Sequence, residues 1–420
     1  MSRRAALSAT SRTAALSASS AAGLLTALTA LTALTALAVT AGTSPAAALP
    51  LPPRGCTSSV PYTAGEGGYD TYRIPAAITT PGGAVLAFAE GRRNSASDTG
   101  SIDVVLRRSI DGGCTWGPTK VVAAGKGNTR GNPAPVVDPR TGRIVLVTSY
   151  NSGAVTEAQI MRGEVTPEQS RRGFVQTSKD DGRSFTAPRD ITADVKLPDW
   201  RWYATGPGHA VALTRGPHAG RLVIPANHSA APPVGSPDTG QEPKYYGAHA
   251  FYSDDGGANW RLGFVDDSYD GYDNANESIA AELPDGRLYF SSRDQNGTST
   301  GNRLDAYSED GAATLTRPYT VQPTLNDVPV VQGSVLQVKN GPLLFSGPSV
   351  STARQSMAIW RSGNAGATFT KAKTLSTSRA AYSDLVQLGG SRVGVLYETG
   401  VSGTYERIEF RRVAMAELAG

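Results

Sequence analysis

An eight-residue pattern recurs five times along this chain and limits what the chain can fold into. It reads "SIDGGCTW" at 109–116, "SKDDGRSF" at 178–185 and "SDDGGANW" at 253–260, with weaker copies at 308–315 and 362–369. In the common form Ser-x-Asp-x-Gly-x-Thr-aromatic, the acid can accept N–H bonds from its own turn, and the glycine permits an unusual backbone angle. We interpret each copy as a structural turn, whose acid is a poor catalytic candidate.

The segments beside the first turn predict four β-strands. The runs "YRIPAAIT", "AVLAFAE" and "IDVVLRRS" precede it and "KVVAA" follows it, and turn residues separate the runs. In the first run, Ile74, Ala76 and Ile78 alternate with other residues, which predicts a half-buried strand. Four strands in sequence with short connections form an antiparallel meander.

The spacing of the turns sets the number of such meanders. Successive copies begin 69, 75, 55 and 54 residues apart, which corresponds to six units of about 60 residues when four strands repeat. Four-stranded sheets arranged radially make a β-propeller, so we predict an all-β, six-bladed propeller. A β-sandwich with a second domain is the alternative, but it would not explain turns spread along the whole chain.

The first 48 residues are typical of an export signal. The basic start carries Arg3, Arg4 and Arg12, an apolar run follows, and "SPAAALP" ends the segment with small residues. The opening "SRRAAL" also resembles a twin-arginine signal. A membrane anchor is the alternative, although the threonines and the short apolar run of this segment favour a signal. We expect residues 1–48 to be a signal peptide, 49–420 the working propeller, and the mature protein to be secreted.

Composition argues against several other classes of protein. Without residues 1–48 the net charge falls from +4 to +1, and the basic residues are interleaved with acids rather than clustered, so no nucleic-acid footprint is expected. The four histidines and two cysteines have no zinc-site spacing. Cys56 and Cys114 could form a disulfide or remain two buried thiols. We expect no cofactor and no required metal.

Together, "YRIP" near the start and the repeated turns resemble the bacterial-type sialidases (neuraminidases), a family with an RIP motif and Asp-box repeats. The resemblance extends over essentially all of the chain after the signal. It implies that three arginines clamp the carboxylate of sialic acid, because a guanidinium binds a carboxylate through two parallel bonds. These would be Arg73 of "YRIP", Arg293 of "SSRDQNG" and Arg354 of "STARQS". Arg92 matches a family arginine near the 4-hydroxyl of the sugar.

The same resemblance assigns four further residues. Tyr382 in "RAAYSDL" matches the nucleophile, and Glu277 in "DNANESI" matches the base that activates it. Asp98, in a loop rich in serine, matches the acid/base aspartate. Glu398 in "LYETG" matches the acid that holds the first arginine in place.

These assignments imply a retaining exo-α-sialidase that acts on sialylated glycoproteins, glycolipids or oligosaccharides. Two alternatives use the same chain: a trans-sialidase, which transfers the sugar to another glycan, and a non-catalytic propeller that binds glycans. A lectin has no need of Asp98, Glu277 and Tyr382 together. We also expect a monomer that has no membrane contact once the signal is removed. Neither the preferred linkage nor the preferred group at carbon 5 follows from the sequence.

The export signal leads to a first testable prediction. Because "SPAAA" is the last small-residue segment before the predicted strands, the mature protein should begin near Leu49 in the culture medium. Mass analysis of the secreted protein would locate its first residue. An intact N-terminus recovered from a membrane fraction would contradict the prediction and favour an anchor.

Overall fold

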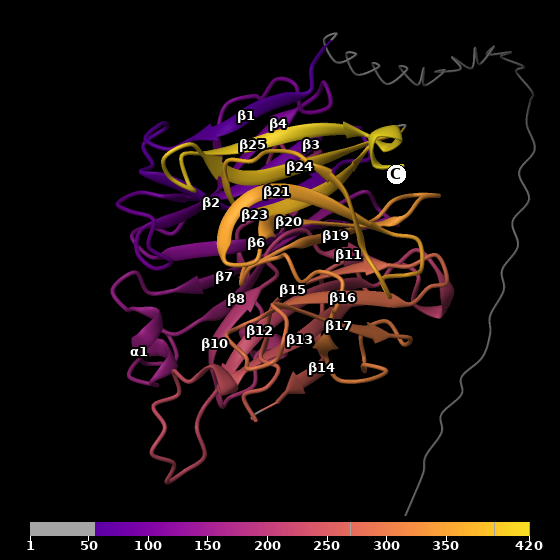
Figure 1. The fold of residues 1–420 in the computed structure, drawn as a ribbon. Coiled ribbons are helices and arrows are strands. Elements are labelled where there is room, and N and C mark those ends of the chain that lie inside the picture. The colour runs from indigo at the N-terminus through magenta and orange to yellow at the C-terminus, as the bar shows by residue number, and fades with distance from the viewer. Residues whose placement is uncertain (1–54, 269, 390, 420) are drawn as a thin grey trace, which may run out of the picture. The chain divides into compact units, whose positions relative to one another are not determined.

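Strands make up nearly all of the regular secondary structure, as Figure 1 shows for this computed structural model, which describes residues 55–268, 270–389 and 391–419. The predicted signal at 1–48 lies outside these residues and stays a prediction. Helical structure among them is limited to α1 (Glu157–Met161), α2 (Thr192–Val195) and the 3-10 turns η1 (Gly216–His218), η2 (Pro243–Tyr245) and η3 (Met415–Leu418). In the part of the chain that is described, no helix is long and apolar enough to cross a bilayer.

The strands follow one another in groups of antiparallel neighbours. The first group is β2 (Thr71–Thr79), β3 (Val85–Arg92), β4 (Ile102–Ser109) and β5 (Lys120–Ala123). The second group is β6 (Thr129–Val137), β7 (Ile144–Asn151), β8 (Arg172–Ser178) and β9 (Arg189–Asp190). The third group is β10 (Trp200–Thr205), β11 (Val211–Ala212), β12 (Leu222–Ala230), β13 (Tyr246–Ser253) and β14 (Arg261–Asp267). In this group β10 and β11 both pair with the same edge of β12.

Three more groups complete the described chain. The fourth is β15 (Ala275–Glu282), β16 (Leu288–Asp294), β17 (Arg303–Ser308) and β18 (Thr320–Val321). The fifth is β19 (Ser334–Gln337), β20 (Leu343–Val350), β21 (Ala353–Ser362) and β22 (Thr370–Thr374). The last is β23 (Arg379–Leu388), β24 (Arg392–Gly400), β25 (Arg407–Ala414) and, returning from the other end of the chain, β1 (Ser58–Thr63). The predicted all-β architecture of antiparallel strand groups is therefore confirmed.

The groups are distinct units rather than parts of one closed sheet. The first and second groups are linked by a single residue pair, Ile102 with Thr129, and the fifth and last by Gln355 with Arg379. Strand pairing is otherwise confined within each group. The groups must therefore be held together mainly by side-chain packing.

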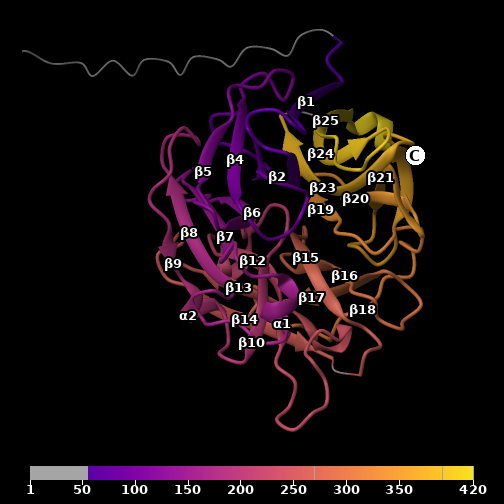
Figure 2. The ribbon, with the colours of Figure 1, turned by 90° about the vertical axis from the view of Figure 1, so that its left-hand side faces the viewer.

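Hydrophobic clusters supply that packing between each successive pair of groups. Each of six clusters draws most of its buried side chains from two neighbouring groups, and one of them joins the last group back to the first. The first strands also lie against one another, β2 between β6 and β23, and β19 between β15 and β23. Figure 2 shows β2, β6, β15, β19 and β23 toward the middle and β5, β9, β14 and β18 toward the outside. The first strands therefore form the interior of this unit.

This interior position changes one expectation about β2. Its alternating pattern predicts a half-buried strand, but every residue from Thr71 to Ile78 is buried. The half-buried prediction is wrong because β2 is covered on both sides, by β6 and by β23. A bulge interrupts its register between Arg73 and Ala76, and Ile74 takes a positive φ of 56°.

The five repeated turns have the local chemistry that the sequence predicts. In the first, Ser109 Oγ donates to Asp111 Oδ1 at 2.7 Å, and Thr115 N donates to the same oxygen at 2.9 Å. The fifth residue donates its N–H back to the serine hydroxyl, at 2.8 Å from Gly113. Equivalent bonds recur in the turns that begin at 178, 253, 308 and 362. Each turn connects the third and fourth strands of a group.

The last group lacks such a turn for a topological reason. Its fourth strand is β1, which comes from the opposite end of the described chain, so no turn connects it to β25. A disulfide between Cys56 and Cys114 joins the segment before β1 to the first of the repeated turns. The pairing that the sequence left open is therefore present.

The disulfide leads to a stability prediction. Cys56 and Cys114 are 58 residues apart, and a closed loop of that length contributes about 4 kcal/mol in the chain-entropy description. The double variant Cys56→Ser, Cys114→Ser should lose roughly that amount of unfolding free energy. Urea denaturation of the variant and of the oxidised parent measures the difference. Equal stability of the two would mean that the bond does not constrain the unfolded chain.

Candidate active site

A cavity of about 220 Å³ lies where the first strands of the groups begin. Its wall carries Arg73 from β2, Asn132 from β6, Trp202 from β10, Glu277 from β15 and Tyr382 from β23. Each of these five strands has an irregular register at or beside that residue. A bulge inserts an extra residue and re-aims side chains. The bulges thus let polar groups of otherwise apolar strands face the cavity.

Glu398 of β24 fixes two of these side chains from behind. It is fully buried, and its carboxylate accepts Arg73 Nε at 3.2 Å and Nη2 at 3.4 Å. The same carboxylate accepts the backbone N–H of Ile74 at 2.9 Å and of Tyr382 at 3.1 Å. One acid therefore sets the guanidinium of β2 and the backbone of β23 relative to each other.

Tyr382 and Glu277 are in direct contact inside the cavity. The phenol donates to Glu277, whose two oxygens lie 2.7 and 2.9 Å away. Burial and the negative charge of Glu277 raise the pKa of Tyr382 above its usual value, against the lowering effect of Arg293, Arg73 and Arg354. The phenol is therefore protonated at neutral pH and has a base within reach of its proton.

Arg293 extends this contact. Its Nη1 lies 2.8 Å from Glu277 Oε2 and donates to the Tyr382 oxygen at 3.2 Å. Its Nη2 donates to Asn276 Oδ1 at 2.7 Å. The guanidinium is positioned by neighbours on β15, and it can stabilise negative charge on the tyrosine oxygen.

Arg354 has the fewest partners of the three predicted clamp arginines. It lies on β21, where its Nη1 donates to the Tyr405 hydroxyl at 2.9 Å, and its guanidinium is 5.7 Å from the centre of the Tyr382 ring. Tyr405 also stacks on Arg73, at 4.1 Å. In the described chain Arg354 forms no ion pair with a carboxylate, so its charge is available to an anion.

Asp98 lies at the rim, with its side chain 56% exposed. Its Oδ1 is 2.7 Å from Arg92 Nη2 and 3.4 Å from Arg73 Nη1. Removal from water would raise the pKa of Asp98, but these two positive charges outweigh it and lower the pKa below its usual range. Glu90 holds Arg92 in turn, at 2.6 Å.

The structure thus brings the eight predicted residues together. Seven line the cavity and Glu398 lies directly behind it. Their roles in a reaction remain predictions. The acids of the repeated turns are instead occupied by their own turns. Within the described residues, no group of three or more His, Cys, Asp or Glu side chains is placed to hold a metal ion.

Sequence reasoning missed a second set of polar residues on the wall. Arg171 is buried and stacks on Trp202 at 4.0 Å, and its Nη2 donates to Asn132 Oδ1 at 2.8 Å. Burial lowers the pKa of Arg171 to about 10, which leaves it charged at neutral pH. Glu157 of α1 accepts the Tyr246 hydroxyl at 3.4 Å. A polar residue near the start of an apolar run, as in "TRGNPAPVV", is the signal that could have identified Asn132.

Comparison with known proteins gives a consistent match. The family described as BNR repeat-like domain matches residues 83–395. A sialidase of Micromonospora viridifaciens is 32% identical over 385 residues, which cover 87% of this chain and 56% of that protein. A sialidase of Bacteroides fragilis is 27% identical over 373 residues, which cover 83% of this chain and 64% of that protein. The chain therefore spans under two thirds of these relatives.

A solved structure is similar over much of its length. The Hadza microbial sialidase Hz136 superposes with a TM-score of 0.72 at 26% identity, covering 85% of this chain and 68% of that one.

The role of Glu398 leads to a prediction about stability. The variant Glu398→Gln leaves the Arg73 guanidinium buried without its anion, and breaking a buried pair costs about 3 kcal/mol or more. Urea denaturation should detect this loss. The control is Glu164→Gln, which removes an exposed pair with Arg162 and should change stability little. Equal effects of the two variants would contradict the proposed role of Glu398 as an anchor.

Proposed function

The chain belongs to the family of BNR repeat-like domains, and we propose that it is a retaining exo-α-sialidase, a glycoside hydrolase that releases terminal sialic acids. The observation that carries the proposal is the contact between Tyr382 and Glu277 at 2.7 Å, in a cavity that also presents Arg73, Arg293 and Arg354. The proposed substrates are sialylated glycoproteins, glycolipids or oligosaccharides, reached by a secreted protein.

We propose further that the six strand groups are the blades of a propeller. Three features support this: each group shares a hydrophobic cluster with the next, the last group packs on the first, and β1 completes the last group. Circular packing leaves no large exposed sheet face. It also places the starts of all first strands around one axis, where the cavity lies.

The guanidiniums favour a substrate with a carboxylate next to the reacting carbon. Arg73 and Arg293 are already paired with Glu398 and Glu277, whereas Arg354 has no carboxylate partner among the described residues. A carboxylate bound between the three would give Arg354 the anionic partner that it lacks. It would also hold the anomeric carbon of a sialoside beside the Tyr382 oxygen.

A tyrosine nucleophile suits this substrate. A carboxylate nucleophile would approach a carbon that already bears a negative group, whereas a phenol is neutral until it reacts. In the first step the Tyr382 oxygen loses its proton to Glu277 and bonds to the anomeric carbon. The bond to the leaving oxygen breaks, and that oxygen takes a proton from Asp98.

The second step reverses these proton transfers. Asp98, now a carboxylate, takes a proton from a water molecule, whose oxygen attacks the anomeric carbon. The bond to Tyr382 breaks, and the phenolate recovers its proton from Glu277. Two displacements on one carbon give sialic acid with retained configuration.

The charge on Asp98 must change for it to act as an acid. Arg92 and Arg73 hold the pKa of Asp98 low. A substrate carboxylate would take over the charge of Arg73, and the leaving sugar would cover the exposed Asp98 side chain. Both changes raise the pKa of an acid, so binding of the substrate favours the protonated form that the first step needs.

The direct test is hydrolysis of sialyllactose, followed by proton NMR of the released sugar. Free sialic acid that appears first as the α-anomer supports the proposal, whereas the β-anomer would contradict retention. Adding excess lactose distinguishes hydrolysis from transfer, since a trans-sialidase makes new sialosides. A protein that binds sialyllactose without releasing sugar would be a glycan-binding propeller instead.

The separate duties of Tyr382 and Asp98 lead to a prediction about their variants. Asp98→Ala removes the proton donor, so sialyllactose hydrolysis should fall by about 10²–10⁴-fold, while an activated aryl sialoside is partly spared. Tyr382→Phe removes the nucleophile, so the hydrolysis of both substrates should slow to a similar extent. The control is Tyr397→Phe, a buried tyrosine of β24 that does not line the cavity.

Covalent trapping identifies the nucleophile directly. A fluorinated sialosyl fluoride should label the parent protein, and peptide mapping should find the adduct on Tyr382. Recovery of the label on Glu277 would mean that base and nucleophile are exchanged. If Asp98→Ala lost activity equally on sialyllactose and on the aryl sialoside, the role of Asp98 as a proton donor would be contradicted.

A further inference from the structure

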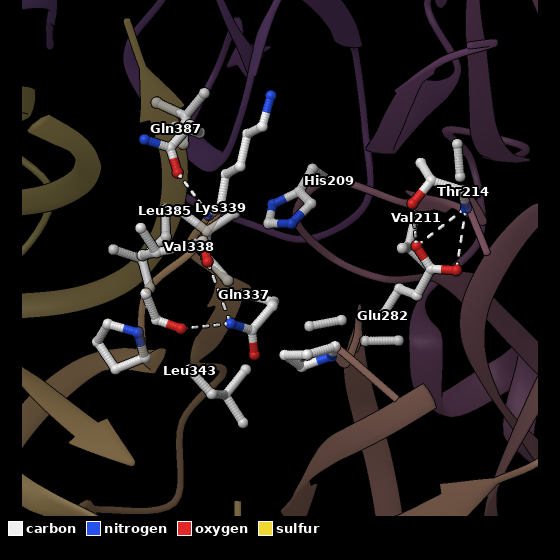
Figure 3. Close-up of a pocket in the computed structure, with 18 of the residues that line it drawn as sticks. His209, Val211, Thr214, Glu282, Gln337, Val338, Lys339, Leu343, Leu385 and Gln387 are labelled. Atoms are coloured by element: carbon white, nitrogen blue, oxygen red, sulfur yellow. Dashed lines mark hydrogen bonds between the residues drawn. The ribbon is translucent and has the colours of Figure 1, made fainter. Parts of the chain in front are cut away.

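A second and larger cavity, of about 1180 Å³, lies farther along the same first strands (Figure 3). The candidate active site takes Arg73 from β2 and Tyr382 from β23, whereas this cavity takes Ala77 and Leu385 from the same strands. The two cavities therefore lie at opposite ends of the first strands. Ligand pockets usually have about 300–1,000 Å³, so the second cavity has room for a small molecule.

The wall of this cavity is largely apolar. Side chains of valine, leucine, isoleucine and alanine come from several groups, namely Ile78, Val136, Val211, Ala281, Leu336, Val338, Leu343 and Leu385. Some of these, such as Leu336 and Val211, are only half-buried. Apolar surface that faces a roomy cavity gains free energy when a ligand removes it from water.

His209 is a polar group of this wall, as are Gln337 and Gln387, and it lies near the middle of the view in Figure 3. Its Nδ1 is 2.7 Å from Asp384 Oδ1, and its backbone N–H donates to Asp384 Oδ2 at 3.0 Å. Asp384 is fully buried and also accepts Ala77 N and Ser334 Oγ, both at 2.8 Å. The imidazole is therefore held in one orientation by a rigid anchor.

Because Asp384 takes Nδ1, the other ring nitrogen of His209 is left for the cavity. Burial would lower the pKa of His209, but the carboxylate beside it outweighs this and raises the pKa above its usual value. When the ring is protonated, both of its nitrogens carry a proton. Its second N–H is a donor at an apolar wall.

The charged residues at the rim add further positive charge. Arg215 and Lys339 are exposed and line the cavity, and within the described chain neither forms an ion pair. The two acids of the rim are occupied: Glu282 accepts the N–H groups of Thr214 and Arg215, and Asp285 pairs with Arg287 at 2.8 Å. The mouth of the cavity is therefore suited to an anion.

We propose that this cavity binds an amphipathic carboxylate, whose apolar body lies on the valine and leucine wall and whose carboxylate accepts the free N–H of His209. Lys339 and Arg215 attract the anion at the mouth. Such a site is separate from the proposed sialidase reaction, because none of its residues lines the candidate active site.

The test uses three small probes and the histidine signals of the full chain. The sequence has only four histidines, so isotope labelling of histidine gives a spectrum that can be assigned. Octanoate should shift the His209 signal in a saturable manner and leave those of the buried His228 and His249 unchanged. The uncharged 1-octanol should bind about tenfold more weakly, since a hydrogen bond to a charged group is worth that much. Acetate, which lacks the apolar body, should not bind.

Variants separate the site from non-specific binding. His209→Gln should weaken octanoate binding by about tenfold. Because that change also affects the contact with Asp384, a second variant is needed. Lys339→Glu reverses a charge on the exposed rim and should weaken the binding of octanoate but not that of octanol. The control is Lys179→Glu, an exposed lysine of a repeated turn outside the cavity.

Several outcomes would overturn the proposal. They are an unshifted His209 signal, equal affinities for octanoate and octanol, or equal effects of Lys339→Glu and Lys179→Glu. Because the measurement uses no sialoside, its failure would leave the proposed reaction untouched, and a failure of that reaction would leave this site untouched.

Discussion

The buried carboxylate of Glu398 is the contact on which the candidate site depends most. It accepts the Arg73 guanidinium and the backbone N–H groups of Ile74 and Tyr382. A buried ion is tolerated only when all its bonds are satisfied, and this one is satisfied by the two strands that must meet. The geometry of arginine and tyrosine is therefore set before any substrate binds.

The charges of the cavity form a system that is close to balance without a ligand. Glu398, Glu277 and Glu90 compensate Arg73, Arg293 and Arg92, and Asp98 lies between two of these guanidiniums. Arg354 and Arg171 remain without a carboxylate partner in the described chain. Glu157 on the wall balances the total charge, so an anion such as the proposed sugar would gain chiefly from Arg354, the clamp arginine without a carboxylate partner.

Asp384 anchors the second cavity as Glu398 anchors the candidate active site. It lies on β23 two residues after Tyr382, and it ties β2, β19 and the loop of His209 together. Residues of one strand thus serve both cavities, since a strand rises about 3.3 Å per residue and Asp384 lies farther along β23 than Tyr382.

The sequence by itself determined the features that depend on neighbours along the chain. Each repeated turn closes through its own serine and an acid, as at Ser109 and Asp111, or through Asn364 in the fifth copy, so the pattern can be recognised from the local sequence. The four runs around the first turn predicted β2 to β5 correctly for the same reason. The resemblance to a family named Tyr382 and Glu277, which do lie in contact. Only the tertiary structure decided which distant groups meet: the bulges that turn polar residues toward the cavity, the return of β1 to β25, and the support of Arg354 by Tyr405. These depend on packing between strand groups, which no local pattern encodes.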